Sequence, residues 1–299
     1  MIRKTILLLI AVVSSMSVNA QLIEVYRNGT LEQSYTSDES DSYKVVFKTG
    51  RDYVEIGGVK WATMNIGATT VADSPETAYG DYFALGEVDT YYSKIDYNTP
   101  DGTPKVVWDK NSTRTHIFGE KTAYDCTNYC GSATFKEWSP CPYDDVGSHT
   151  YKFKPEYDVA RAKWGGNWHM PQGNDMQNLY SACGGHDEPS PVPSNITKGG
   201  VYLVPAKTLV DGTTYNVAGL LFVAKEDINK RLFFPCAGRI KGTELIESGS
   251  YGYYWYPYLA GAPDMDPNYA RNLSIRPNDF VLYDISDRYI GLTVRPVLD

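Results

Sequence analysis

Histidine, cysteine and long apolar runs are scarce in this sequence, and each shortage argues against a class of protein. The longest apolar run, residues 6–13, has eight residues, whereas a membrane-spanning helix needs about 20. We therefore expect no transmembrane segment. None of the four histidines, His116, His149, His169 and His186, lies at a spacing from cysteine that indicates a Cys/His hydrolase.

The first twenty residues have the order of a secretory signal peptide. Arg3 and Lys4 precede the apolar run 6–13, and the sequence VNA at 18–20 places small residues at a cleavage position. No cysteine lies near that position, so lipid attachment there is not expected. We expect residues 1–20 to be removed during export through the Sec pathway to the periplasm, the cell surface or the extracellular medium.

Basic residues are outnumbered by acidic ones. The chain has 28 Lys and Arg against 36 Asp and Glu, and loss of Arg3 and Lys4 with the signal peptide changes the net charge from −8 to −10. An acidic surface repels phosphate backbones and anionic headgroups. Nucleic acid is therefore not expected as a partner, and a glycan or a protein remains.

Five cysteines leave one unpaired if disulfides form. Cys126, Cys130 and Cys141 are close in sequence, and one bridge within this cluster suits an exported protein, although the spacing leaves the pairing open. A zinc site there would need a fourth ligand, for which only His149 is near, and Cys-x3-Cys is a weak indication. Cys183 and Cys236, distant from the cluster, are expected as small buried apolar residues.

Tyrosine, proline and glycine are abundant instead, with 25, 17 and 26 residues. This mixture is typical of a loop-rich extracellular domain rather than of a helical bundle. Residues 22–26 and 31–35 flank Asn28 and Gly29, which together predict a hairpin, and 43–47 predicts a third strand. We expect these strands to form a small β appendage over 21–50, followed by one domain over 51–299.

Three stretches near the C-terminus organise the expected domain. Residues 231–235 and 292–297 have the composition of buried strands, and 251–258 holds five tyrosines and a tryptophan. They predict a core that the C-terminal part of the chain closes. Two helices are expected at 157–164 and 172–183.

The second expected helix is the better defined one. Met176, Leu179, Tyr180 and Cys183 lie on one apolar face, and Asn174 and Asp175 are candidate caps. Residues 54–61 contain a glycine turn between two apolar halves. Short strands are expected at 201–204, 215–217 and 219–224, whereas 88–157 has no sustained period. Few helices among many short strands indicate an α+β fold.

Six motifs carry a resemblance to a known family. They are VKWATMN at 59–65, YGDYFALGE at 79–87, WHMP at 168–171, FFPCAGR at 233–239, GYYW at 252–255 and VRPV at 294–297. In this order, residues 51–299 resemble the Fibrobacter succinogenes major paralogous domain. The resemblance implies an exported protein of a Bacteroidetes-type bacterium with a C-type lectin-like fold, related to formylglycine-generating enzymes and to the variable proteins of diversity-generating retroelements. Where the family usually has Arg and Thr, this chain has His169 and Gln172, while Asp175 keeps the family's acid.

The related activities leave several functions open. A non-enzymatic binding or adhesion module is favoured. A formylglycine-generating-enzyme-like oxidoreductase would need Cys183 and Cys236 to converge as a reactive pair, and neither has the basic neighbours in sequence that favour a thiolate. A retroelement-diversified variable binding protein is the other alternative.

No cofactor is expected, and calcium is the alternative that the fold suggests. The segment DMDPN at 264–268 begins like a calcium loop, but Tyr269 stands at its sixth position, where glycine is needed, and Ile275 at its twelfth, where glutamate is needed. The segment RPND at 276–279 lacks the preceding acid of a calcium-dependent lectin. Arg239 and Arg295 are expected to be structural.

The aromatic block predicts the ligand surface. If 251–258 is a strand, Tyr253 and Trp255 point inward, while Tyr254, Tyr256 and Tyr258 point outward. Exposed tyrosines provide rigid contact area for a glycan or a protein. Together with Tyr269 and Trp138, the three outward tyrosines are the predicted binding residues. The alternative is that the block belongs to the core.

Overall fold

The structure is a computed structural model of the chain. It describes residues 21–27, 30–37, 52–90, 92–108, 143–145, 151–185, 188–241, 244–256 and 269–299. The chain divides into two compact units, residues 1–50 and 51–299. The predicted signal peptide 1–20, the strand at 43–47, the cysteine cluster, Trp138, Tyr258 and the calcium-loop candidate 264–268 lie outside the described residues.

In the first unit, β1 (Gln21–Arg27) and β2 (Thr30–Ser37) form an antiparallel hairpin. This confirms the hairpin that the Asn28-Gly29 pair predicts. The register shifts between Val25 and Tyr26, as at a β-bulge, which increases the local twist.

In the second unit, one sheet joins segments from both ends of the domain. Its order is β3-β4-β21-β9, formed by β3 (Tyr53–Ile56), β4 (Val59–Ala62), β21 (Val297–Leu298) and β9 (Trp168–His169). β21 pairs antiparallel with both β4 and β9, with Val297 opposite Trp61 and His169. The prediction that the C-terminal run closes the core is confirmed, although Val297 is the only residue of 292–297 that belongs to a strand.

A second sheet forms the centre of the domain. It consists of β10 (Ser190–Pro191), β11 (Gly200–Val204), β14 (Gly219–Val223) and β15 (Arg231–Pro235), in that order. All five residues of β14 are buried, because layers cover the sheet on both faces. The predicted strands at 201–204, 219–224 and 231–235 are confirmed.

The long stretch after residue 88 was expected to lack regular structure, and this was wrong in part. β5 (Tyr92–Asp96) and β6 (Lys105–Trp108) form an antiparallel pair that joins β16 (Arg239–Lys241) and β17 (Glu244–Ile246) in one sheet. β7 (Tyr143–Asp145) and β8 (Tyr151–Phe153) form a separate hairpin. A further hairpin pairs β12 (Thr208–Val210) with β13 (Thr213–Tyr215).

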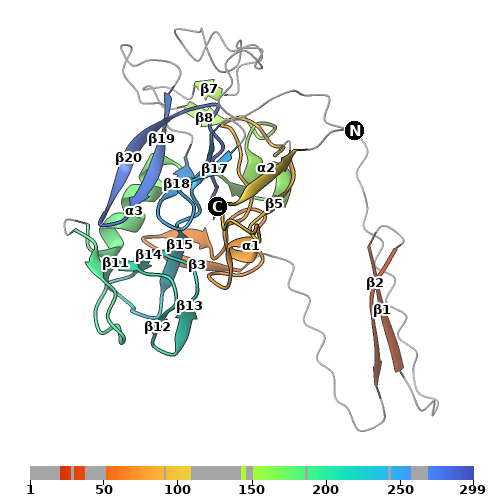
Figure 1. Cartoon of the computed structure of the whole chain (residues 1–299), viewed down its shortest axis with the longest axis horizontal. Helices are drawn as coiled ribbons and strands as arrows, with labels where there is room; N and C mark the ends of the chain where they lie inside the picture. The colour runs from red at the N-terminus through yellow and green to blue at the C-terminus, as the bar shows by residue number, and fades with distance from the viewer. Residues whose placement is uncertain are drawn as a thin grey trace. The chain divides into compact units, whose positions relative to one another are not determined.

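The aromatic block leads into a three-stranded sheet. β18 (Gly252–Trp255) pairs with β19 (Tyr269–Arg276), which pairs with β20 (Asp279–Asp287). Figure 1 shows β19 and β20 as a long hairpin on one side of the domain. The sequence analysis did not predict this hairpin.

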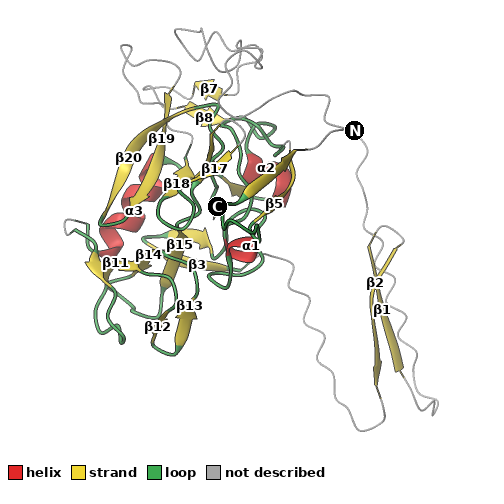
Figure 2. Ribbon diagram, viewed as in Figure 1, coloured by secondary structure: helices red, strands yellow, loops and turns green. Residues whose placement is uncertain are grey.

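Three short helices complete the described part of the domain (Figure 2). They are α1 (Pro75–Ala78), α2 (Val159–Trp164) and α3 (Gly173–Cys183). α3 packs against β11, β14, β3 and β4 through Met176, Leu179 and Cys183. The expected α+β class, with few helices among many short strands, is confirmed. None of the described helices has both the length and the hydropathy needed to cross a membrane.

The N-cap of α3 differs from the sequence prediction. Asn174 and Asp175 were predicted as caps and first-turn acids. Gln172 is the N-cap residue instead, whereas Asp175, the third residue of the helix, is confirmed as an acid in its first turn. The Asp175 carboxylate accepts a hydrogen bond from the backbone N–H of Gln172 at 2.7 Å, so it satisfies a donor at the free end of the helix.

Candidate functional site

The structure places the aromatic block inside the domain. Tyr254 and Tyr256 were predicted to be exposed, but they are 2% and 0% exposed, and Tyr253 and Trp255 are buried as well. The outward prediction was therefore wrong for both tyrosines. β18 has buried side chains on both faces, so alternation along the strand does not separate core from surface.

The four buried rings of the block, Tyr253 to Tyr256, each donate a hydrogen bond to an acceptor, which explains how so many can be buried. The hydroxyls of Tyr254 and Tyr256 donate to the carbonyls of Pro235 and Leu282. The Trp255 indole donates to the Phe83 carbonyl at 2.8 Å. A buried phenol or indole is tolerated when its polar group is paired in this way.

A different exposed surface lies on the β19–β20 hairpin. Tyr283 and Ile285 are 41% and 40% exposed, and Arg271 lies directly opposite Ile285. Cross-strand partners share a face, so Tyr269, two residues before Arg271, also lies on this face, half-buried. We call Tyr269, Arg271, Tyr283 and Ile285 the hairpin face.

The hairpin face is held in place by contacts around it. The Tyr283 hydroxyl donates to Gln177 Oε1 on α3 at 2.9 Å, and its ring meets Tyr256 edge-on with centroids 6.3 Å apart. Arg271 Nη1 donates to the Tyr283 carbonyl at 2.7 Å. The ring and the guanidinium are therefore positioned before any ligand arrives, which lowers the entropy cost of binding.

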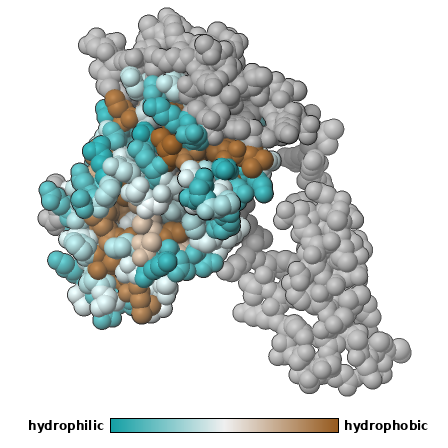
Figure 3. Space-filling model, in the orientation of Figure 1, coloured by the Kyte–Doolittle hydropathy of each residue, from teal (hydrophilic) through white to brown (hydrophobic). Residues whose placement is uncertain are grey.

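The surface around the hairpin face is otherwise mixed. Figure 3 shows the described surface on this side mainly in teal and white, with separate brown groups. In the described part of the chain, the remaining exposed large apolar residues are Tyr53, Val71, Val107 and Leu209. They lie on other elements or loops, so the hairpin face is distinguished by two exposed apolar side chains two residues apart on one strand.

A second group of contacts joins Arg239, Glu247 and Tyr253. Arg239 and Glu247 form an ion pair with Nε and Oε2 2.9 Å apart, and the guanidinium lies 4.6 Å from the Tyr253 ring centre. The Tyr253 hydroxyl donates to Glu247 Oε2 at 2.9 Å, and burial raises the pKa of this phenol. The cluster is internally paired, which confirms the structural role expected of Arg239.

Arg295 is also structural, and its side chain is almost fully buried, at 1% exposed. Nε donates to Asn65 Oδ1, Nη1 to the carbonyls of Ala62 and Thr63, and Nη2 to that of Phe233, all within 2.8–3.1 Å. The guanidinium also lies 4.7 Å from the Phe234 ring centre. Burial lowers the pKa of Arg295 to about 10.

The two described cysteines are free and buried. Burial raises the pKa of Cys183 and of Cys236 to about 12, so both are thiols at neutral pH. Cys183 borders a small pocket of about 50 Å³, together with Lys198, Tyr202 and Lys225. Ligand pockets generally occupy about 300–1,000 Å³, so this one is too small to hold a typical ligand.

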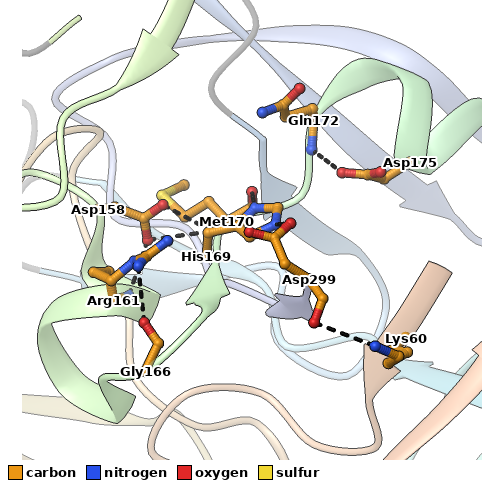
Figure 4. A network of polar contacts seen from close by, with 9 residues as sticks. All are labelled: Lys60, Asp158, Arg161, Gly166, His169, Met170, Gln172, Asp175 and Asp299. Carbon is orange, nitrogen blue, oxygen red and sulfur yellow. Dashed lines mark hydrogen bonds and ion pairs between the residues drawn. The ribbon is translucent and has the colours of Figure 1, made fainter.

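A network of polar contacts surrounds the end of β21 (Figure 4). His169 Nε2 lies 2.9 Å from Asp299 Oδ1, and Nδ1 lies 2.8 Å from the Met170 carbonyl. Asp158 caps α2 by accepting from the N–H groups of Ala160 and Arg161.

Asp158 also accepts from the N–H of Met170 at 3.0 Å and so fixes β9 to α2. Burial raises the pKa of Asp158 more than these hydrogen bonds lower it. The network lies at the seam where β9, α2, α3 and β21 meet.

No metal site occurs within the described residues, where no cluster of three or more His, Cys, Asp or Glu side chains could hold an ion. The 276–279 segment instead connects β19 to β20, with Asp279 Oδ1 accepting from the N–H of Phe280.

No family model matches the sequence, and neither a curated protein nor a solved structure shows significant similarity to it. The candidate site therefore depends on the geometry of this chain alone. Of the predicted binding residues that the structure describes, which are Tyr254, Tyr256 and Tyr269, only Tyr269 lies on the hairpin face. The sequence analysis missed Arg271, Tyr283 and Ile285, which the alternating pattern on both sides of Pro277 and Asn278 could have indicated.

Proposed function

We propose that this chain is an exported, non-enzymatic binding or adhesion module with a C-type lectin-like fold, and that it binds a protein ligand through the hairpin face. The observation that carries the proposal is the exposed pair Tyr283 and Ile285 beside a positioned arginine. Tyrosine and arginine are enriched among the residues that dominate protein interfaces.

The fold assignment is supported by the way the domain closes. β21 pairs with β4, so the beginning and the end of residues 51–299 meet in one sheet beside α3. The loop-rich sheets around this closure agree with what the resemblance implies. The predicted signal peptide supports export to the periplasm, the cell surface or the medium.

A protein ligand is favoured over a glycan because of the shape and composition of the site. The exposed aromatic and aliphatic side chains stand on a strand face, and the described pocket, beside Cys183, is much smaller than a typical ligand site. An exposed strand face with Tyr, Ile and Arg suits a protein surface of complementary shape. Binding to a glycan array alone would contradict this choice of ligand.

The state of the cysteines bears on the enzyme alternative. An oxidoreductase resembling the formylglycine-generating enzymes needs accessible thiolates, whereas the buried Cys183 and Cys236 have pKa values near 12. The alternative of a retroelement-diversified protein makes a distinct prediction. Sequences of close relatives would vary at Tyr269, Arg271, Tyr283 and Ile285 and would keep the buried block.

The test compares two double variants of residues 21–299 in a pull-down and on a glycan array. Tyr283→Ala with Ile285→Ala should weaken binding to a captured protein at least about tenfold, which corresponds to about 1.4 kcal/mol at a hot spot. Leu209→Ala with Val107→Ala removes two apolar residues elsewhere, which are 59% and 39% exposed, and should leave binding unchanged. Unaltered binding by the Tyr283 and Ile285 variant would overturn the proposal, provided that both variants unfold at similar temperatures.

A further inference from the structure

The strand β20 forms one edge of its sheet. The order β18-β19-β20 gives β20 one paired side, and in the described part of the chain no strand pairs with its other side (Figure 1). At nine residues, Asp279–Asp287, it is longer than an average strand. A long edge strand presents backbone N–H and C=O groups with which a strand of another chain can pair, and the exposed Tyr283 and Ile285 would favour such pairing further.

Two backbone N–H groups of β20 are already occupied by aspartate side chains. The N–H of Phe280 donates to Asp279 Oδ1 at 2.7 Å, and the N–H of Ile285 donates to Asp284 Oδ1 at 2.9 Å. In each case the carboxylate belongs to the preceding residue. It therefore takes the place that a carbonyl of an added strand would fill.

The pairing of β19 with β20 indicates that both N–H groups face the outer edge. Phe280 and Ile285 lie opposite Ile275 and Arg271 of β19. These two partners are four residues apart, and the register shift within the pair accounts for the extra residue on β20. Since bonded and unbonded pairs alternate along an antiparallel ladder, Phe280 and Ile285 share the same phase. Because both N–H groups donate to carboxylates, that phase is the one directed away from β19.

Other groups along β20 also oppose the addition of a strand. The Tyr283 carbonyl accepts from Arg271 Nη1 at 2.7 Å, and the Asp287 carbonyl accepts from the N–H of Ile290 at 3.1 Å. The sequence of β20, DFVLYDISD, has three aspartates and no lysine or arginine. Two copies paired antiparallel about Tyr283 would bring Asp279 of one copy opposite Asp287 of the other, and like charges directly opposite are destabilising.

We propose that Asp279 and Asp284 close the outer edge of β20, so that neither a second copy of this chain nor an extended segment of another protein adds a strand there. Each carboxylate closes the edge by accepting from the next N–H along the chain, and an added strand would have to break that bond. The hairpin face then meets a ligand through its side chains, and the backbone of β20 takes no part. This closure goes beyond the proposed function, because it holds whatever the hairpin face binds.

The test measures the self-association of residues 21–299 by sedimentation velocity at rising protein concentration. Asp279→Ala with Asp284→Ala frees both N–H groups and removes two of the three carboxylates of β20. This variant should self-associate at least about tenfold more tightly than the unaltered chain, since unpaired edges promote association. Amide hydrogen exchange of Phe280 and Ile285 should slow as the variant associates, because a second copy then covers both groups. Association that leaves the exchange of both amides unchanged would lie elsewhere and would contradict the proposal.

Two matched variants separate the hydrogen bonds from other effects. Asp279→Asn with Asp284→Asn removes the same charges but keeps an Oδ1 that can accept from each N–H, so its association should stay within about twofold of that of the unaltered chain. Arg276→Met removes the ion pair with Asp284 at 3.0 Å but leaves the bond to Ile285, so it too should not associate. An asparagine variant that associates as tightly as the alanine variant would show that charge alone keeps the copies apart, which would overturn the proposal.

The unaltered chain provides a measurement that does not require any variant to fold. Because the N–H groups of Phe280 and Ile285 are hydrogen-bonded within one copy, they should exchange at least about tenfold more slowly than in an unstructured peptide of the same sequence. Their protection should not depend on protein concentration. Exchange at the rate of the unstructured peptide would overturn the proposal, and so would protection that increases with concentration.

Discussion

Replacement of Arg295 by methionine should destabilise the domain by about 3 kcal/mol. Methionine fills a similar apolar volume but donates no hydrogen bond, so the variant leaves four acceptors unpaired. Asn65 Oδ1 and the carbonyls of Ala62 and Phe233 are buried, and the carbonyl of Thr63 is partly buried. An unpaired buried acceptor costs about 1–3 kcal/mol. At about 1.5 kcal/mol each, the four together cost about 6 kcal/mol.

The variant also removes a cost. A fall in the Arg295 pKa from 12.5 to about 10 means that burying the charge costs about 3 kcal/mol at neutral pH. Removing the charge recovers this amount, which leaves a net loss of about 3 kcal/mol. The midpoint of urea unfolding, followed by tryptophan fluorescence, measures the difference directly.

A matched variant tests whether burial is responsible. Arg276 forms an ion pair with Asp284 at 3.0 Å, and its side chain is 43% exposed, so Arg276→Met should cost less than about 1 kcal/mol. If Arg295→Met and Arg276→Met lower the unfolding free energy equally, the argument from buried acceptors is wrong.

Two further predictions concern single positions. Gly57 has φ +63°, and an added Cβ would lie 2.5 Å from the Asn178 carbonyl oxygen of α3, whereas Gly58 at φ +73° has open space. Gly57→Ala should therefore lower the free energy of unfolding by about 3 kcal/mol or more, and Gly58→Ala should lower it by about 1 kcal/mol. Equal losses in urea unfolding would contradict the close approach of Gly57 to Asn178. Cys183 and Cys236 are buried, with pKa values near 12. Peptide mapping should therefore find both cysteines unalkylated after iodoacetamide treatment of the native chain at pH 8, and alkylated after the same treatment in urea. Rapid alkylation of either cysteine in the native chain would show an open site.

The closure of the domain could be predicted from sequence because it depends on composition. The run 292–297 is β-branched and apolar, and Leu292 and Val294 are indeed fully buried. The α3 face was predicted for the same reason, since Met176, Leu179 and Cys183 recur at helical spacing. Such patterns indicate which side chains are buried, and the structure confirms that these side chains are buried.

The orientation of the tyrosines could not be predicted in the same way. A period of two separates the faces of a strand, but it does not show whether one face or both faces are covered. The hydroxyls of Tyr254 and Tyr256 are paired with carbonyls of Pro235 and Leu282, which are 19 and 26 residues away. Backbone acceptors are present at every residue, so sequence alone does not indicate which tyrosines find one inside the core.

The hairpin face was missed because its strands contain many polar residues. β19 and β20 carry Arg271, Asn272 and Asp284 among apolar residues, and a register shift lies between Asn272 and Ser274. The alternation is present in each strand, but the register shift means that the sequence does not show which residues of the two strands share a face. The shortage of basic residues argues against nucleic acid as a partner, but it does not indicate the position of Arg271, the single arginine on this face.

The placement of β21 has a consequence for how the domain folds. Arg295 bonds to Asn65 across 230 residues, and Lys60 bonds to the Asp299 carbonyl across 239. Contacts of such long range form slowly, because the intervening chain must first lose much of its conformational freedom. Until residues 295–299 are in place, β4 and β9 each present an unpaired edge, and such edges can pair with other chains. Folding of residues 51–299 is therefore expected to be late and cooperative, and a chain shortened before residue 295 should aggregate rather than form a smaller stable domain.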